Sequence, residues 1–432
     1  MQDTIAAIAT AAGAGGVAII RLSGENSLQI AKNMFSKQDG EYIPNYMYSG
    51  HIRGAGFTDY GFMVYFKAPK SFTGEDVVEL HCHGGVHLAR GILKECIALG
   101  ARSAERGEFT RRAFLNGKLS LASAEGMADM INAESLALLR AGSLLYSEKL
   151  TQKVTALQGR LKDILAGIAV EIDYPEEDAD GTDFEKIAES IESLNSEVNT
   201  LINSYSSGKK IKKGVTVAIC GKPNTGKSSL LNALLGYEKA LVSDEAGTTR
   251  DAVEGALELD GVIYNFIDTA GIRESAGVVE KMGIERAKSV IQSADVILSV
   301  TEDDEVELPQ GVSGKIIKVF NKIDVKEPKN ACDICVSAKT GEGIDGLKKL
   351  IVSCGMDGAS LEKAFVVEER HYDALKRAAA ALVSAADGMR SLTLDLIAVD
   401  LKDAWDALGE ITGETASEEI ISTVFAKFCV GK

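Results

Sequence analysis

The chain contains 432 residues, a length that predicts about three domains of ordinary size and excludes a single small fold. A hydrophobic share of 45% with 25% charged residues is typical of a folded globular protein and excludes a disordered one. Because 47 Lys and Arg stand against 63 Asp and Glu, the net charge is −16, and most of the surface should repel nucleic-acid phosphate. Any contact with nucleic acid is therefore expected to be local.

The cysteines and the first residues indicate the compartment. Seven cysteines without dense paired spacing suggest reduced thiols in the cytosol. No basic residue precedes Arg21, unlike in a signal peptide, and no apolar run is long enough to span a bilayer. We therefore expect a soluble, cytoplasmic protein with no membrane association.

Residues 1–118 have the pattern of a mixed α/β domain. Runs at 17–22, 61–66 and 77–82 predict strands, while the spacing at 87–99 predicts a helix. The domain ends in a basic run that either faces an anionic ligand or is a solvated loop with scattered ion pairs. Its members are Arg102, Arg106, Arg111, Arg112 and Lys118.

Helical sequence follows and encloses a second α/β block. Apolar residues at spacings of four and three predict long helices over 150–168 and 187–201, and helical sequence returns after residue 368. Between them a basic linker, 209–213, is expected to lead into alternating strands and helices, which predict a parallel sheet. We therefore expect an α/β domain at 1–118, a helical domain at 119–212 and 356–432, and an α/β domain inserted at 213–355.

Residues 221–228 match the phosphate-binding loop pattern: Gly221-Lys222-Pro223-Asn224-Thr225-Gly226-Lys227-Ser228. The loop follows a predicted strand and precedes a predicted helix, as the pattern requires. Its glycines let backbone N–H groups surround phosphate oxygens, Lys227 supplies charge at the β and γ phosphates, and the Ser228 hydroxyl suits Mg²⁺. The loop alone does not separate ATP from GTP.

Three further motifs follow in the order expected of a GTPase. Asp268-Thr269-Ala270-Gly271 ends a predicted strand, which places Asp268 to reach Mg²⁺ through water and the Gly271 N–H near the γ-phosphate. In Asn321-Lys322-Ile323-Asp324, the Asp324 carboxylate can accept from two guanine donors that adenine lacks. Ser337-Ala338-Lys339 then offers main-chain donors to the base.

The hydrolysis step leaves a question open. Residues 247–251 predict a switch loop whose Thr249 completes the Mg²⁺ shell when the γ-phosphate is present. Ile272 stands where many small GTPases carry a Gln that orients the attacking water. From the residues alone, the replacements are an arginine finger (Arg250 or Arg273), a glutamate that orients water (Glu274, Glu280 or Glu285), or a monovalent cation at Asn224.

The histidines and cysteines also leave alternatives. Cys332 and Cys335 have redox spacing, but their predicted strand favours buried apolar packing. For Cys429, a frayed terminus is the default expectation, and a flexible tail that brings the thiol to a site is the alternative. Strand alternation places Glu79, His81 and His83 on one face of a predicted strand. These residues form either a metal site or a polar strand face or ligand pocket.

Taken in order, these motifs resemble the MnmE (TrmE) family of tRNA modification GTPases over essentially the whole chain. The N-terminal segments resemble the family's folate-binding domain, and the chain end resembles its Cys-Ile-Gly-Lys terminus. Relatives often carry Pro, Pro and a basic residue at Ala11, Ala12 and Ala14, and Pro at Arg106. The matching segments are Asp3-Thr4-Ile5, Gly15–Gly24, Thr73–Glu79, His83-Gly84-Gly85, Gly107–Leu119 and Cys429-Val430-Gly431-Lys432.

The resemblance implies chemistry beyond GTP hydrolysis. Family members work with a flavoprotein partner, MnmG, which carries FAD, to add an aminomethyl or carboxymethylaminomethyl group to C5 of the wobble uridine of certain tRNAs. The one-carbon unit comes from a formyl- or methylene-tetrahydrofolate on the N-terminal domain. By resemblance, Arg21, Glu79, Lys118 and Lys432 hold the folate, and Cys429 approaches the one-carbon site as a candidate catalytic residue.

The resemblance also implies a substitute for the missing Gln. In the family the G domains of a homodimer associate across the nucleotide, K⁺ supplies the charge of a finger, and Glu280 orients the water. The implied K⁺ ligands are Asn224, Ser243, Glu245 and Thr248, and the Mg²⁺ ligands are Ser228 and Thr249. The implied contacts of GTP or GDP are Gly221, Asn224, Thr225, Gly226, Lys227, Ser228, Ser229, Ser243, Asp244, Glu245, Ala246, Gly247, Thr248, Thr249, Asp268, Thr269, Ala270, Gly271, Asn321, Lys322, Asp324, Ser337, Ala338 and Lys339, with Lys227 also catalytic.

A competing hypothesis is a regulatory nucleotide switch, whose GTP state recruits a partner and whose N-terminal domain only senses a ligand. The two hypotheses share the nucleotide site. They differ in the role of four residues, which one-carbon chemistry needs and a simple switch does not: Arg21, Glu79, Lys118 and Cys429.

Overall fold

The computed structural model describes most of the chain as two compact units. The described residues are 3–36, 41–173, 184–236, 255–268, 288–302, 311–328, 331–356, 366–389 and 393–431. The first unit consists of Met1–Ala128, Leu144–Leu194 and Arg377–Lys432, and the second of Asp129–Ser143 and Asn195–Lys376. Within the described ranges, no helix has both the length and the apolar character that a membrane span requires.

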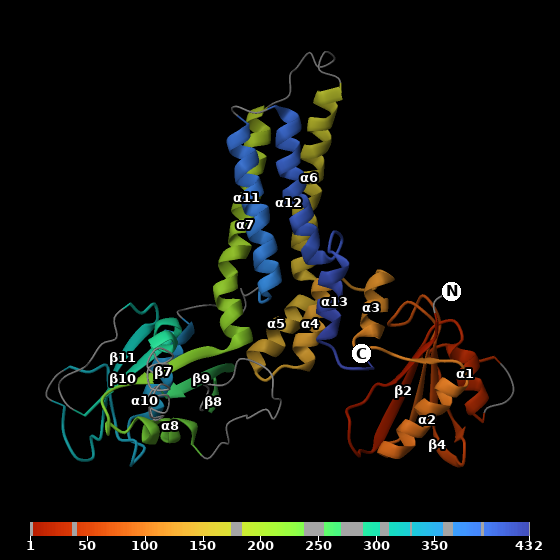
Figure 1. Ribbon diagram of the computed structural model, residues 1–432, viewed down its shortest axis with the longest axis horizontal. Helices are drawn as coiled ribbons and strands as arrows, with labels where there is room; N and C mark the ends of the chain where they lie inside the picture. Colours follow the sequence, from red (N-terminus) through yellow and green to blue (C-terminus); the bar gives the residue numbers. More distant parts are fainter. Residues whose placement is uncertain are drawn as a thin grey trace, which may run out of the picture. The chain divides into compact units, whose positions relative to one another are not determined.

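A six-stranded sheet opens the first unit, in the order β3-β4-β5-β2-β1-β6. Neighbouring strands are antiparallel, except that β1 and β6 pair in parallel. Helices α1 and α2 lie against this sheet (Figure 1). The elements are β1 (Ile5–Ile8), β2 (Val17–Ser23), α1 (Ser27–Met34), β3 (Met47–Gly54), β4 (Phe57–Phe66), β5 (Val77–His83), α2 (Val86–Ala98) and β6 (Arg102–Ser103).

Apolar and polar residues alternate along β5, so its two faces differ in burial. Its apolar residues are buried in a core that they share with Met34 of α1 and Ile92 of α2. The alternate residues Glu79, His81 and His83 lie on the opposite face and are half-buried or exposed. The helices thus cover one face of the sheet, and the other face carries the polar residues of β5.

Helices complete the first unit. Figure 1 shows α6 and α12 side by side, and Arg377 of α11 donates to Glu410 of α12 at 2.9 Å. The Ser417 hydroxyl caps α13, whose Phe425 shares a core with Leu121 of α4. The elements are α3 (Glu108–Leu115), α4 (Leu121–Ile131), α5 (Leu136–Tyr146), α6 (Lys149–Asp173), α11 (Glu369–Gly388), α12 (Leu394–Thr412) and α13 (Glu418–Ala426). Residues 129–131 of α4, 136–143 of α5 and 369–376 of α11 belong to the second unit.

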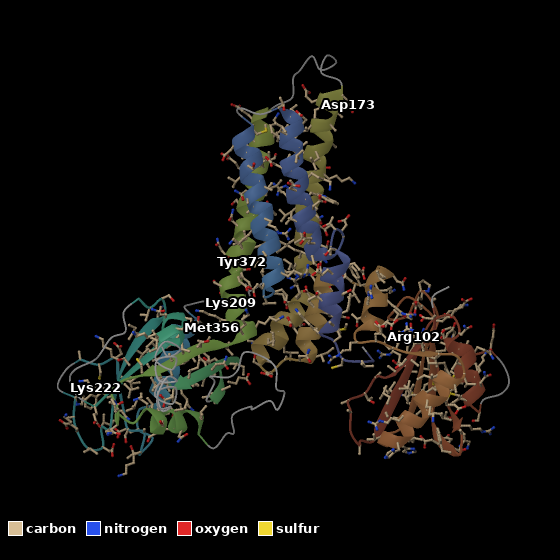
Figure 2. All side chains as sticks on the ribbon, viewed as in Figure 1. Arg102, Asp173, Lys209, Lys222, Met356 and Tyr372 are labelled. Atoms are coloured by element: carbon tan, nitrogen blue, oxygen red, sulfur yellow. The ribbon has the colours of Figure 1, made fainter. Side chains whose placement is uncertain are left out.

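The basic stretch 209–213 is helical, so the predicted linker is wrong. Helix α7 (Phe184–Lys213) runs through it, and Ile211 is buried. Tyr205 of α7 stacks on Tyr372 of α11 with ring centroids 4.2 Å apart, and Figure 2 labels Lys209 and Tyr372 on these helices. The apolar stripe therefore continues to the end of α7. The positively charged lysines there also stabilise the helix, because they lie at the negative end of its dipole.

The second unit contains a six-stranded sheet in the order β12-β11-β10-β7-β9-β8. All neighbours are parallel except the edge strand β8, which is antiparallel to β9, and this mostly parallel sheet confirms the predicted fold. Strand β7 lies between β10 and β9, at the switch point where such sheets bind ligands. The elements are β7 (Val215–Cys220), α8 (Lys227–Leu235), β8 (Gly255–Leu259), β9 (Val262–Asp268), β10 (Val296–Thr301), β11 (Lys315–Asn321), β12 (Ile334–Val336) and α10 (Ile344–Met356).

Candidate functional site

The segment after β7 has the backbone of a phosphate-binding loop. Gly221 and Gly226 have φ angles of +147° and +86°, and Asn224 has a φ of +65°, so the chain turns sharply before α8 begins at Lys227. Figure 2 labels Lys222 in this loop. A helix start reached through such a loop presents unpaired N–H groups, which favour a phosphate.

The Lys227 side chain lies over this loop. The residue is 7% exposed, and its Nζ donates to the carbonyl oxygens of Gly221 at 3.1 Å and Lys222 at 2.9 Å. An ammonium group has three N–H donors, so it can hold both carbonyls and still donate to a phosphate oxygen. This geometry suits the charge-neutralising role expected of the lysine.

Ser228 and Asp268 meet across the carboxyl end of the sheet. The Ser228 hydroxyl donates to Asp268 Oδ2 at 3.0 Å, and Asp268 is 2% exposed at the end of β9, in register with Ile219 of β7. Hydroxyl and carboxylate oxygens are ligands that Mg²⁺ prefers. The donor set therefore fits a divalent cation.

Asn321 ties the base motif to the phosphate loop. It is 1% exposed, and its Nδ2 donates to the Thr225 carbonyl at 2.9 Å, while its Oδ1 accepts from the Ala338 N–H at 3.1 Å. Lys322 Nζ donates to the Asn224 carbonyl at 2.7 Å. The sequence motif names Asn321 but gives no sign of this link, because its two ends are 96 residues apart in the chain.

Asp324 is oriented by the loop that follows β12. The Ser337 hydroxyl donates to Asp324 Oδ1 at 2.7 Å and accepts from the Thr340 N–H at 3.2 Å. Asp324 itself is exposed, so a base can reach it. The structure thus brings the phosphate loop, Asp268, the 321–324 motif and the 337–339 loop to one edge of the sheet. Ser229 and Lys339 are exposed beside them.

Other predicted contacts lie outside the described residues. For the nucleotide and its ions these are Ser243, Asp244, Glu245, Ala246, Gly247, Thr248, Thr249, Thr269, Ala270, Gly271 and Glu280, and for the folate Lys432.

Comparisons with known proteins identify the family. The model described as the MnmE helical domain matches residues 121–429, and the one described as the GTP-binding protein TrmE N-terminus matches residues 4–118. A tRNA modification GTPase MnmE from Natranaerobius thermophilus is 39% identical, with 100% of both chains covered. The chain belongs to the MnmE family of tRNA modification GTPases. The MnmE of Clostridioides difficile is 36% identical, again with 100% of both chains covered.

Solved structures match smaller parts of this MnmE-family chain. The G domain of the T. maritima FeoB iron transporter is 30% identical over 32% of this chain and 97% of its own, with a TM-score of 0.23. Era, solved with MgGDPNP and a segment of 16S ribosomal RNA, is 30% identical over 39% of this chain and 66% of its own, with a TM-score of 0.27. The G-domain fold of this chain rests on its own mostly parallel sheet and its phosphate-binding loop.

A second polar site lies on the open face of the N-terminal sheet. Arg21 of β2 pairs in register with Glu79 of β5, Arg21 Nε donates to Glu79 Oε1 at 2.9 Å, and His81 Nε2 lies 3.2 Å from Glu79 Oε2. Burial acts to raise the pKa of Glu79, but the contacts with His81 and Arg21 outweigh it and lower that pKa below its ordinary value. Glu79 is therefore a carboxylate at neutral pH. The Arg21 guanidinium also lies 5.8 Å from the Phe109 ring centroid, a contact that the sequence did not reveal.

The chain end packs against this site, so the expected frayed terminus is wrong. Gly431 is buried, and its carbonyl accepts from Arg21 Nη1 at 3.4 Å. Val430 forms an antiparallel bridge with Arg106, while the Cys429 side chain is exposed. Backbone pairing holds the tail, and side-chain patterns carry no signal for it.

Lys118 lies apart from the contacts of Arg21 and Glu79 with each other, and its predicted role in holding a folate stays a prediction. It is exposed, and its Nζ donates to the Pro69 carbonyl at 3.0 Å. Of the four predicted folate residues, the structure brings Arg21 and Glu79 into contact.

The basic run at 102–118 largely forms ion pairs, the second of its two predicted interpretations. Arg102 and Arg112 share the carboxylates of Asp3 and Glu108, and Arg111 pairs with a glutamate of α13. These contacts fasten α3 to the start of β1 and to α13.

The polar face of β5 does not hold a metal cluster. His83 Nδ1 lies 2.6 Å from Asp59 Oδ1 on β4, whereas His81 is held by Glu79. In the described part of the chain, no three His, Cys, Asp or Glu side chains are grouped to hold a metal ion. Cys332 and Cys335 also differ from their prediction, because both are half-buried rather than buried.

Proposed function

We propose that the chain hydrolyses GTP to drive modification of the wobble uridine of certain tRNAs at C5. The flavoprotein MnmG would be its partner and would carry FAD, and a formyl- or methylene-tetrahydrofolate on the N-terminal domain would supply the carbon. The product would bear an aminomethyl or carboxymethylaminomethyl group. The working form would be a cytoplasmic homodimer.

One observation carries the nucleotide half of this proposal. Asn321, in the motif that reads the base, holds the phosphate loop through the Thr225 carbonyl. A site in which the base motif and the phosphate loop support each other is suited to a whole guanine nucleotide rather than to a phosphate alone. In this site Lys227 would neutralise charge on the β and γ phosphates, Ser228 with Thr249 would bind Mg²⁺, and Asp324 would select guanine. When bound, Mg²⁺ would stabilise the charge that develops on the phosphates.

Charge neutralisation during hydrolysis is assigned to K⁺. Because Ile272 cannot orient water, we assign that role to Glu280. The side chains assigned to bind K⁺ are those of Asn224, Ser243, Glu245 and Thr248. Asn224 supports the assignment because it is exposed, in a left-handed conformation, at the outer turn of the phosphate loop. An arginine finger is worth roughly 10³ to 10⁵ in rate, and a cation acts on the same developing charge.

The one-carbon half of the proposal centres on Arg21 and Glu79. An ionised Glu79 suits the N–H donors of a pterin, and basic groups suit the glutamate carboxylates of a folate. Lys118 and Lys432 would complete the pocket. Cys429 would approach the carbon unit, since the tail beside it is held by Arg21 through Gly431.

The first test is GTP turnover in K⁺ and in Na⁺ at equal ionic strength. We expect strong stimulation by K⁺, which Asn224→Ala should abolish. Asn224→Gly is the matched variant, because glycine loses the side chain without strain at a φ of +65°. Equal turnover in both salts would contradict the K⁺ assignment. It would favour an arginine finger, Arg250 or Arg273, as the source of the positive charge.

The second test separates the enzyme from a nucleotide switch. Arg21→Ala and Glu79→Gln should abolish formation of the modified wobble uridine, measured by mass spectrometry of tRNA nucleosides, without changing GTP turnover. Arg53→Ala, at an exposed position of β3, is the matched control and should change neither. Modification that persists without Arg21 and Glu79 would favour the switch.

A further inference from the structure

Two cysteines beside the base-reading loop lie within reach of each other. The sulfurs of Cys332 and Cys335 are 2.7 Å apart, and both residues are half-buried. A disulfide bond is about 2.05 Å long, so closing one requires a movement of less than about 1 Å. Because the pair is only half-buried, small oxidants and reductants can reach it, and the two sulfurs need little movement to bond.

The backbone holds the two cysteines in this arrangement. Asp333, between them, accepts the Lys318 N–H at 2.8 Å through its carboxylate and donates its own N–H to the Lys318 carbonyl at 3.0 Å. Cys335 then pairs with Phe320 in the parallel ladder of β12 and β11. Because Asp333 and Cys335 are both held to β11, the sheet edge fixes the backbone around the two sulfurs.

The protonation of Cys335 fits a resting dithiol. Burial raises its pKa to about 11, with further contributions from the hydrogen bond and charge of Cys332. At neutral pH Cys335 is therefore a thiol that can donate to its neighbour. A thiol needs an oxidant before it forms a disulfide.

The pair is connected to the part of the site that reads the base. Ser337, two residues after Cys335, bonds Asp324, and its N–H donates to the Glu342 carbonyl at 2.9 Å. The Cys335 carbonyl packs so closely on Gly343 that a Cβ there would lie 2.3 Å from it. With no free space on that side, a shift of Cys335 is passed to the Ser337 loop.

We propose that Cys332 and Cys335 form a reversible disulfide whose closure displaces Ser337 and lowers the affinity of the G domain for guanine nucleotide. The effect on affinity rests on the proposed nucleotide site, whereas the disulfide itself does not. In a reducing cytosol such a bond forms transiently, as is typical of redox-sensing pairs.

The oxidant in this step is a small-molecule disulfide, RSSR. The Cys332 thiolate attacks one sulfur of RSSR and releases RS⁻, which takes up the proton that Cys332 lost. Cys335 then loses its proton, attacks the Cys332 sulfur and expels the second RS⁻, which is protonated in turn. Two protein thiols are oxidised and RSSR is reduced to two RSH, so atoms and electrons balance.

The test uses the full chain in glutathione buffers of graded reduced-to-oxidised ratio. After alkylation of free thiols, mass mapping should find a 332–335 disulfide that dithiothreitol reverses. The oxidised chain should bind a fluorescent GDP about two- to tenfold more weakly than the reduced chain, the worth of one hydrogen bond. Cys332→Ser and Cys335→Ser should bind GDP as the reduced chain does and should not respond to oxidant.

Cys354→Ser is the matched control, because Cys354 is also half-buried in the second unit but has no cysteine beside it among the described residues. This variant should respond to oxidant as the native chain does. Absence of the 332–335 disulfide, or equal affinity of the two redox forms, would overturn the inference. A reduced chain that binds no GDP would contradict the proposed nucleotide site and the effect on affinity, while mass mapping would still report the disulfide separately.

Discussion

At residue 226, the absence of a side chain allows two loops to meet. Gly226 has a φ of +86°, and a Cβ there would lie 2.5 Å from Asn321 Nδ2, the atom that donates to the Thr225 carbonyl. Gly226→Ala must therefore displace the amide that joins the base motif to the phosphate loop. We expect affinity for GDP to fall about tenfold or more, because a buried hydrogen bond is lost and its partners are left unpaired.

Gly56→Ala is the control for backbone strain in that experiment. Gly56 has nearly the same φ, +82°, but a Cβ there would meet nothing within 4 Å. Its substitution should cost about 1 kcal/mol of folding free energy and leave GDP binding unchanged. Equal GDP affinity in native chain and Gly226→Ala, measured by calorimetry, would show that Asn321 does not support the nucleotide site.

At the scale of elements, the last turn of α7 is fixed by a buried ion-pair cluster. Lys212 Nζ donates to Asp129 Oδ1 at 2.8 Å and also contacts Glu368, and both carboxylates are buried. Lys212→Ala removes the cation that these two buried carboxylates share. We expect it to lower the free energy of unfolding by about 3 to 5 kcal/mol in urea denaturation.

The neighbouring lysine is the matched control. Lys213 pairs with Glu369, but both side chains are largely exposed, at 58% and 67%. Lys213→Ala should therefore cost less than about 1 kcal/mol. If the two variants are equally stable, the cluster is not what fixes the end of α7.

Asp3 pairs with Arg102 of β6 and Arg112 of α3, and these ion pairs predict that the stability of the fold depends on pH. The hydrogen bond from Arg102 lowers the pKa of Asp3 from 3.8 to about 2, against a smaller opposing effect of burial, and Arg112 adds to the lowering. A carboxyl group with a lowered folded-state pKa stabilises the fold fully above about pH 4 and loses that effect as the pH falls toward 2. Asp3→Asn should therefore lower the melting temperature at pH 7, and the difference from the native chain should shrink at pH 3. A difference that stays constant from pH 7 to pH 3 would contradict this.

Elements and motifs could be predicted from the sequence where the signal is local. The strands β2 and β7, the helix α6 and the nucleotide motifs are visible because apolar period, glycine spacing and motif order lie within short windows. At the end of α7 the sequence predicts a linker, because four lysines surround Ile211 and obscure the signal of this buried apolar residue. The Asn321 link and the contacts of the tail could not be predicted, since each joins residues far apart in the chain through backbone atoms, which leave no trace in side-chain type.

At the scale of the whole molecule, one unit joins the two ends of the chain. The Gly107 N–H donates to the Cys429 carbonyl at 3.4 Å, Val430 bridges to Arg106, and Arg21 donates to Gly431. Residues 429–431, which follow α13, are thus held by residues of the 1–118 segment. For the proposed one-carbon chemistry, this tie is what sets the distance between Cys429 and Arg21.

Gly431 is the residue on which that tie can be tested. Its φ is +94°, and a Cβ there would lie 2.3 Å from the Ile8 carbonyl, so Gly431→Ala should release the tail from the sheet. We expect faster hydrogen exchange at 426–431 and at 104–108, measured by mass spectrometry, together with weaker binding of a tetrahydrofolate. Gly117→Ala, at a φ of +67° with nothing within 4 Å of its Cβ, should leave both unchanged. Faster exchange with unchanged folate binding would separate the tail from the folate site, and unchanged exchange would mean that the backbone contacts of the tail do not hold it in solution.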